Sequence, residues 1–401
     1  MAFLDELRAR VEQTRGDDLA HATALVDLAE VEPLLGHRIA PVRAAIDAAA
    51  VVLDKVAAPE LRARILLRLA QVKLVQVDFE GADQALNAVG EHVPEHTAMR
   101  FLTGVKACRV ALRRGPEQRK LAGEMLLHSA AALPQFDADD VIWQRVASEV
   151  SLGIAEVALH EQTPDEAAFE PLRQLVDELG SDPAHVDTVF TAQQVLATFA
   201  ISIGDGIRAV AAMRAVLKIA QGAGSPADEV EARLGLAGLL VTQTQGPAGH
   251  VSRDEAARHV QRARDTALEH ELTELHHAAL IAQAGVLADG GKTAGALDRM
   301  LQLARSAAAD QDVPRYVAAV GMMAELYARS GDAISAFRTI TESHRALSEA
   351  TKSDATPLFR PHLAALRERI GSERLEQIAA DISRANQLAA ELEPKSGNDP
   401  S

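Results

Sequence analysis

The segment from residue 270 to residue 277, His-Glu-Leu-Thr-Glu-Leu-His-His, comes closest to a catalytic motif. A zinc-protease motif needs histidines at i and i+4 on one helical face, with a glutamate as general base. Here Glu274 occupies the i+4 position, so the required second histidine is absent. His270, Glu274 and His277 could still bind a metal, and a helical metal-binding protein or enzyme centred on them is one alternative. We favour a polar turn followed by a first helical turn, in which these side chains are solvated.

No other group of residues predicts catalysis. Walker, GxSxG and GxGxxG motifs do not occur in a strand–turn–helix context. Asp137, Asp139 and Asp140 lie where a helix should begin, so their carboxylates complement the helix dipole better than they would serve acid–base chemistry. We therefore expect a protein without enzymatic activity and without a cofactor.

A basic stripe is the second feature that could do chemistry. Lys106, Arg109 and Arg113 lie at i, i+3 and i+7, so one helix would present them on one face. Such a stripe could receive an acidic peptide or a carboxylate, although Asp or Glu from a neighbouring helix could balance the charges as well. The net charge of −16 argues against nucleic acid as the main partner, because phosphates demand clustered Lys and Arg.

The composition predicts helices packed on helices. The 401 residues are 48% hydrophobic but only 3% aromatic, and the apolar residues are mostly Ala, Leu and Val. Alternating strand patterns are missing. The single cysteine, Cys108, lies among apolar residues and is expected to be a buried thiol. The first residues lack a signal-peptide core, and no segment reaches the roughly 18 apolar residues of a membrane span, so we expect a cytoplasmic protein.

The elements that must position these residues repeat along the chain. In Tyr-Ala-Arg-Ser-Gly-Asp-Ala-Ile-Ser-Ala-Phe (327–337), Gly331 can end one helix in the αL conformation and Asp332 can begin the next. A small residue follows such a break at about every 42 residues, which predicts a solenoid of helix hairpins. These residues are Ala82, Ala122, Ala168, Ala209, Ala256, Ala296 and Ala336. Pro59 and Pro116 fall where helices should begin, and Ser252 to Glu255 form a capping box that should begin another.

One repeat in particular matches a known pattern of large, small and turn residues. It contains Val320, Ala324, Tyr327, Gly331, Ala336, Ile340 and Ser343, and an earlier repeat contains Leu280, Ala284, Leu287, Gly291, Ala296 and Met300. The pattern resembles the tetratricopeptide repeat (TPR), in the longer-helix form of bacterial regulators and adaptor proteins. The resemblance implies an all-α, right-handed superhelical solenoid of antiparallel helix hairpins with helical caps.

The implied organisation has four parts. Residues 1–57 would form an N-terminal helical cap, and residues 58–354 about seven TPR-like hairpins. Residues 355–392 would form C-terminal capping helices, followed by a disordered tail at 393–401.

The same resemblance implies a function. In such arrays the first helix of each hairpin lines a concave groove, and the corresponding positions here are Arg64, Gln71, Gln194, Thr198, Glu325 and Arg329, with Lys106, Arg109 and Arg113 from a less similar repeat. We therefore expect a non-enzymatic scaffold or adaptor that binds a protein or peptide, possibly an acidic one, in this groove. The alternative is a regulatory protein gated by a ligand or peptide that changes the curvature of the solenoid.

Overall fold

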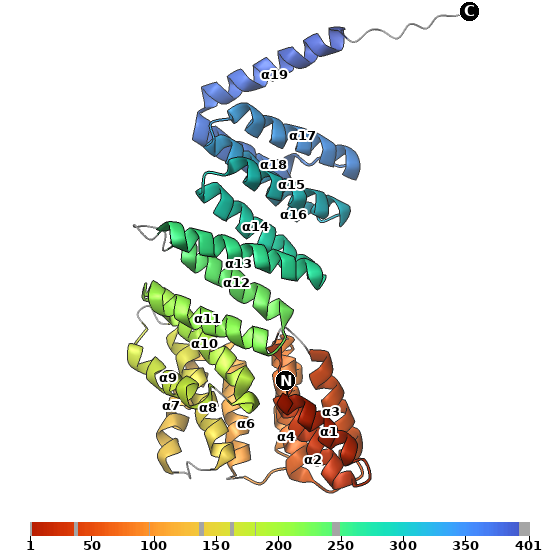
Figure 1. Cartoon of the computed structure of the whole chain (residues 1–401), viewed down its shortest axis with the longest axis vertical. Coiled ribbons are helices and arrows are strands. Elements are labelled where there is room, and N and C mark those ends of the chain that lie inside the picture. The colour runs from red at the N-terminus through yellow and green to blue at the C-terminus, as the bar shows by residue number, and fades with distance from the viewer. Residues whose placement is uncertain are drawn as a thin grey trace, which may run out of the picture. The chain divides into compact units, whose positions relative to one another are not determined.

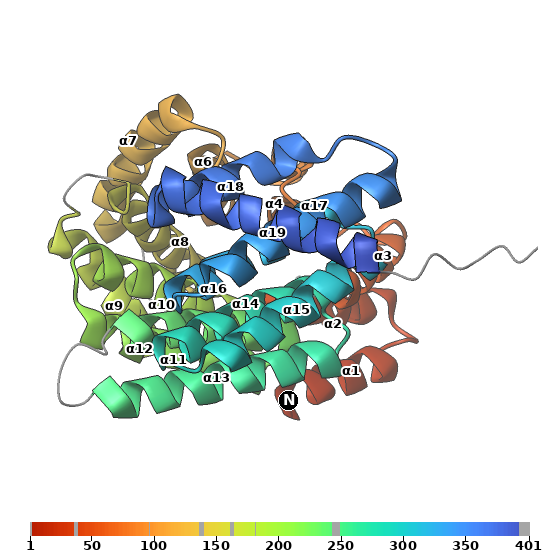
Figure 2. The ribbon, with the colours of Figure 1, turned by 90° about the horizontal axis from the view of Figure 1, so that it is seen from above.

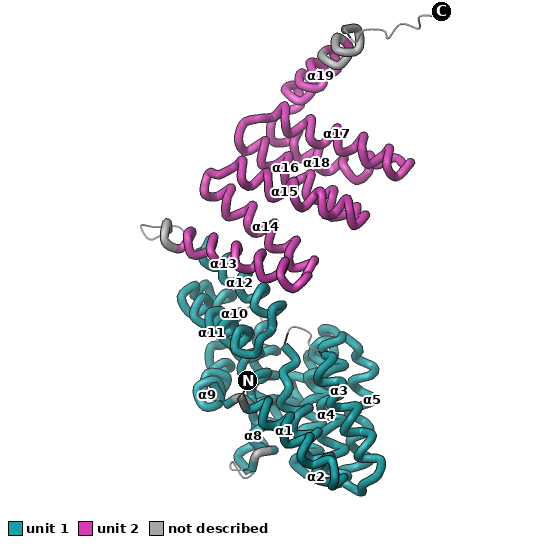
Figure 3. Tube along the Cα trace, turned by 45° about the vertical axis from the view of Figure 1, so that its right-hand side comes forward, with its two compact units in different colours: residues 1–243 teal, residues 244–401 magenta. Residues whose placement is uncertain are grey.

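The computed structural model describes residues 2–35, 39–95, 97–135, 140–160, 164–180, 182–242 and 249–392. Every regular element in these ranges is a helix, as the sequence predicts. The chain divides into two compact units, residues 1–243 and residues 244–401 (Figure 3). None of the described helices is both long enough and apolar enough to cross a membrane. The predicted tail at 393–401 lies outside the described residues.

The first unit is a series of antiparallel helices in which each packs on its neighbours in the chain (Figure 1). Its helices are α1 (Ala2–Gln13), α2 (Asp18–Val31), α3 (Ile39–Leu53), α4 (Pro59–Val75), α5 (Phe79–Val89), α6 (Ala98–Leu112), α7 (Pro116–Ala132), α8 (Val141–Ala158), α9 (Glu170–Leu179), α10 (Val186–Ser202), α11 (Gly206–Gly222) and α12 (Pro226–Thr242). A short 3-10 turn, Pro183–His185, leads into α10. Even-numbered helices from α2 to α12 are the first helices of successive hairpins, and odd-numbered helices from α3 to α11 are the second.

The second unit continues the same local pattern. Its helices are α13 (Gly249–Glu269), α14 (Thr273–Asp289), α15 (Thr293–Ala309), α16 (Val313–Arg329), α17 (Ala333–Thr351), α18 (Thr356–Ile370) and α19 (Ser372–Leu392). Figures 1 and 2 show α14 to α17 close together, and each of these helices packs on the next in the chain. Met300, Leu303 and Ile340 are fully buried in the core that these helices share.

The turns within hairpins have the geometry that Gly331 predicts. Gly331 has a φ of +87°, and the Asp332 side chain accepts a hydrogen bond from the backbone N–H of Ser335. The left-handed residue is not always glycine, since Val77 between α4 and α5 has a φ of +60°. A β-branched side chain is strained in that region. The hairpin therefore imposes the turn, and glycine only makes the turn less costly.

The repeating small residues lie where helices meet closely. Six of the seven aligned alanines are at most 1% exposed, namely Ala82, Ala122, Ala209, Ala256, Ala296 and Ala336. The seventh, Ala168, is half-buried in a 3-10 turn before α9. A larger side chain at the six buried positions would separate the helices. The alignment of the repeats is thus confirmed at these six positions.

One predicted boundary is wrong. The capping box from Ser252 to Glu255 lies inside α13, which begins at Gly249. A capping interaction contributes only about 1 kcal/mol, so it does not prevent a helix from beginning a turn earlier. Pro59 and Pro116 do begin α4 and α7, as predicted.

Candidate functional site

The first helices of the hairpins in the first unit surround a cavity of about 330 Å³. We call it the inner cavity. Its walls come from α2, α4, α6, α8, the start of α10 and the 3-10 turn before α10, and no second helix of a hairpin contributes to it among the described residues. The polar side chains that line it and are used below are Glu30, Arg64, Arg68, Gln71, Lys106, Arg145, Glu149, Asp187 and Thr188.

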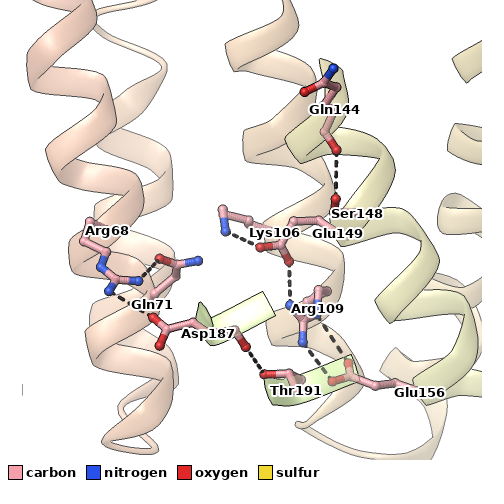
Figure 4. Close-up of polar contacts among 10 residues, drawn as sticks. All are labelled: Arg68, Gln71, Lys106, Arg109, Gln144, Ser148, Glu149, Glu156, Asp187 and Thr191. Atoms are coloured by element: carbon pink, nitrogen blue, oxygen red, sulfur yellow. Dashed lines mark hydrogen bonds and ion pairs between the residues drawn. The ribbon is translucent and has the colours of Figure 1, made fainter. Parts of the chain in front are cut away.

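A chain of ion pairs joins α6 to α8 beside this cavity (Figure 4). Lys106 Nζ donates to Glu149 Oε1 at 2.6 Å, and Arg109 donates to the other oxygen of Glu149 and to Glu156 Oε1, the latter at 2.8 Å. The Lys106, Arg109 and Glu149 side chains are each at most 12% exposed. Burial raises the pKa of the Glu149 carboxyl, but the charges of Lys106 and Arg109 outweigh that effect and lower the pKa to about 2.

The predicted basic stripe is therefore not a free surface. Lys106 and Arg109 are only 12% exposed and are balanced by acids from α8, and Arg113, which is 46% exposed, lies 3.6 Å from Glu156. Of the explanations that the sequence left open, the structure selects pairing with acids of a neighbouring helix. The pairing removes the physical reason for expecting an acidic partner.

A second group of ion pairs links α2 to α4 and α8. Arg64 donates to Glu30 and, at 2.8 Å, to Asp27, while Arg145 of α8 donates to Glu30 Oε2 at 3.0 Å. Burial raises the pKa of the Glu30 carboxyl, but Arg64 and Arg145 outweigh it and lower the pKa to about 2. Glu30 thus fixes α4 and α8 to the same helix.

Arg68 and Asp187 connect parts of the first unit that are more than 100 residues apart. The Arg68 guanidinium donates to the Ala29 and Glu32 carbonyls and, at 3.0 Å, to Asp187 Oδ2 (Figure 4). Asp187 also accepts a hydrogen bond from the backbone N–H of Leu34 at 3.0 Å. The start of α10 is therefore held against the end of α2 and against α4, and the inner cavity has a fixed outline.

The remaining predicted groove residues fall into two groups. Gln71 lines the inner cavity and accepts a hydrogen bond from Arg68, whereas Gln194 and Thr198 are exposed on α10 and do not line it. Glu325 and Arg329 lie on α16 in the second unit, where Glu325 accepts hydrogen bonds from both Arg329 and Arg369.

Glu325 and Arg329 border a cavity of about 500 Å³ in the second unit. Its lining includes small residues such as Ala284, Gly321 and Ala365, from α14, α16 and α18. These three are again first helices of hairpins. Each unit thus has a cavity on the side of its hairpins that the first helices form.

Two of the three ligands of the metal-site alternative are already engaged, and the third, His270, is exposed in the turn after α13. Glu274 accepts two hydrogen bonds from Arg315, and the buried His277 contacts Ser306 Oγ through Nε2 and Arg315 through Nδ1. Because Arg315 donates to Nδ1, the Nε2 atom carries the proton of a neutral imidazole. His277 is thus a buried structural side chain. In the described ranges, no set of three or more His, Cys, Asp or Glu is placed to hold a metal ion.

Sequence reasoning missed Arg68, Arg145, Glu149 and Asp187. A usable signal existed for two of them. Arg68 follows Arg64 by one helical turn. Glu149 and Glu156 on α8 are seven residues apart, as are Lys106 and Arg113 of the preceding hairpin, so the acids match the bases in spacing. No comparable pattern marks Asp187, whose contacts depend on how distant helices meet.

Comparison with known proteins agrees with the local architecture. Neither a protein-family model nor a curated protein matches the chain. The chain is similar to a signal-transduction ATPase with numerous domains from Pyrococcus horikoshii, which has a tetratricopeptide repeat sensor. The two are 12% identical and superpose with a TM-score of 0.60, and the match covers 89% of this chain and 54% of that one. This chain thus spans about half the length of that protein. It has a TPR-like helical-repeat fold.

Two further structures are more distantly similar. A Rap protein complexed with competence and sporulation factor has 12% identity and a TM-score of 0.46, over 93% of this chain and 99% of that one. A human IFIT1 dimer with m7Gppp-AAAA has 12% identity and a TM-score of 0.30, over 96% and 95%. Neither similarity is close enough to carry an argument about function.

Proposed function

We propose that this chain is a non-enzymatic scaffold or adaptor that binds a peptide segment of a partner protein against the first helices of its hairpins. The observation that carries the proposal is the position of the cavities. In each unit a cavity is lined by first helices of hairpins, with the 3-10 turn before α10 added in the first unit, and the volumes are about 330 Å³ and about 500 Å³. Volumes of roughly 300–1,000 Å³ are typical of ligand sites.

Of the two cavities, we propose that the inner cavity of the first unit is the principal site. Its polar groups converge on one space and are held by ion pairs, so they need little ordering when a ligand binds. Arg68 makes four hydrogen bonds to Ala29, Glu32, Gln71 and Asp187, which fixes its guanidinium. A peptide offers backbone donors and acceptors that suit such a wall.

The test begins with selection of binders from a phage-displayed library of random peptides, using the full chain. The affinity of a selected peptide is then measured for two variants. Thr188→Trp places an indole in the inner cavity, at a residue for which the described structure has no side-chain hydrogen bond to lose. Ala318→Trp is the matched control, since Ala318 is exposed and lines the cavity of the second unit.

We expect Thr188→Trp to weaken peptide binding at least tenfold and Ala318→Trp to leave it within twofold, with both variants keeping the wild-type melting temperature. The proposal is contradicted if no peptide is enriched over the naive library, or if Thr188→Trp binds as the wild type does.

One observation favours a second candidate, a peptide-gated regulator. The ion pairs Glu30–Arg145 and Arg68–Asp187 close the first unit between distant helices, and a ligand that competed for these groups would loosen that closure. Energy transfer between dyes on Val51→Cys and Leu127→Cys, both exposed positions, would detect the change. Labelling is selective because Cys108 is buried. Unchanged transfer in the presence of saturating peptide would exclude gating of this kind.

A further inference from the structure

A second cavity adjoins the inner cavity and differs from it in chemistry. It has a volume of about 310 Å³ and lies between α1, the end of α2, the start of α10 and the end of α11. Val31 and Val186 line both cavities, so the two share a wall. The second cavity is mostly apolar, with Phe3, Leu4 and Ile219 in its lining. We call it the apolar cavity.

The inner cavity has hydrogen-bond donors that the described protein does not use. Lys106 Nζ makes one hydrogen bond, to Glu149, although an ammonium has three N–H donors. Arg145 uses only its Nη2, toward Glu30, and Gln71 uses only its carbonyl oxygen, toward Arg68. For the other N–H groups of these three residues, no acceptor occurs in the described part of the chain. These donors belong to side chains that line the cavity, so an occupant that brings acceptors would form hydrogen bonds that the protein alone does not make.

Three carboxylates that line the same cavity are already engaged. Both oxygens of Glu30, of Glu149 and of Asp187 accept hydrogen bonds from the protein. Each of these carboxylates also faces at least one cation, so the buried charges of the site are balanced. A carboxylate on the ligand would add an uncompensated negative charge beside these carboxylates, in a chain whose net charge is −16. A neutral acceptor makes the same hydrogen bonds without that cost.

We propose that the occupant is an extended peptide with two specific features. A neutral acceptor side chain, that of Asn, Gln, Ser or Thr, accepts from Lys106 and Arg145 in the inner cavity. A large apolar side chain a few positions away enters the apolar cavity past Val31 and Val186. This inference rests on the proposed function, because it names the class of peptide that the inner cavity takes.

The experiment uses peptides selected from the random library with the full wild-type chain. Enriched sequences should pair a neutral polar residue with a nearby Leu, Ile, Val or Phe, and Asp and Glu should be depleted. In the best peptide, replacing the neutral polar residue with an acidic one (Asn→Asp or Gln→Glu) should weaken binding at least tenfold. Exchange of the apolar residue for Ala should weaken binding by a similar factor.

Two protein variants assign these effects to the cavities. In Lys106→Met, replacing the neutral polar residue of the peptide with Ala should weaken binding by a smaller factor than it does with the wild-type chain, because one of the two donors to that residue is gone. In Ile219→Asn, replacing the apolar residue of the peptide with Ala should matter little. Circular dichroism checks that each variant folds, and the peptide exchanges on the wild-type chain test the inference even if Lys106→Met does not fold.

Failure of the inference is distinguishable from failure of the proposed function. If Thr188→Trp abolishes binding but the enriched peptides are acidic, or carry no apolar residue that matters, the inference is overturned and the proposed function stands. If Thr188→Trp has no effect on binding, the proposed function itself is overturned.

Discussion

Replacing Glu149 with glutamine is the substitution whose cost can be estimated most directly from the structure. The Glu149 side chain is 10% exposed and balances both Lys106 and Arg109. Lowering its pKa from the ordinary 4.5 to about 2 corresponds to about 3 kcal/mol of interaction with its surroundings. Removing one partner of a buried ion pair costs a similar amount, about 3–5 kcal/mol. We therefore expect Glu149→Gln to destabilise the first unit by about 3 kcal/mol.

Urea denaturation followed by tryptophan fluorescence measures this effect in the right unit. The only tryptophan, Trp143, lies on α8 with its ring centroid 5.4 Å from that of Phe101 on α6, so its emission reports on the contact between these helices. Glu12→Gln is the matched control, because Glu12 is 61% exposed and pairs with an exposed Arg15. That substitution should cost less than about 1 kcal/mol. A Glu149→Gln variant as stable as Glu12→Gln would refute the view that the α6–α8 ion pairs hold the inner cavity together.

Three further predictions concern other parts of the fold. Val77→Gly should raise the free energy of unfolding by about 0.5–1 kcal/mol. The φ of +60° strains valine in the folded state, and relief of this strain exceeds the cost of the extra conformational entropy that glycine gives the unfolded chain. A lower melting temperature would contradict this. Ala336→Phe should lower the free energy of unfolding by about 1–3 kcal/mol or more, because Ala336 is fully buried. Ala328→Phe, beside the cavity of the second unit, should lower it much less. Equal melting temperatures would show that the assignment of helix faces is wrong. Burial and the charge of Arg315 lower the pKa of His277, so the stability that depends on its neutral form is present above pH about 6.5 and is lost as the pH falls further. His277→Gln should therefore show a smaller loss of melting temperature between pH 7 and pH 5 than the wild type, and parallel curves would exclude this role.

Much of the fold could be predicted because its signals are local. The turn at Gly331 and the start of α17 depend on residues within a few positions of each other, namely Gly331, Asp332 and Ser335. The buried alanines recur about once per repeat, at the same place in the pattern of large, small and turn residues. Periodicity and turn chemistry therefore predicted the helix hairpins correctly.

The electrostatics of the site could not be predicted in the same way. Lys106 and Arg109 looked like a free basic face because the acids that balance them, Glu149 and Glu156, are 40 to 47 residues away. Which acids face them depends on the rotation of α8 about its axis, and this rotation is set by packing against α6. The Arg68–Asp187 contact spans 119 residues and depends on how several hairpins stack, so no local pattern marks it.

Hydrogen–deuterium exchange with a selected peptide bound is the most direct test of the central claim that the first helices of the first unit form the binding face. The account predicts that the peptide slows exchange in α4, α6, α8 and the start of α10, and leaves α5, α7 and α9 unchanged. Protection confined to those second helices, or to the helices of residues 249–392, would contradict it.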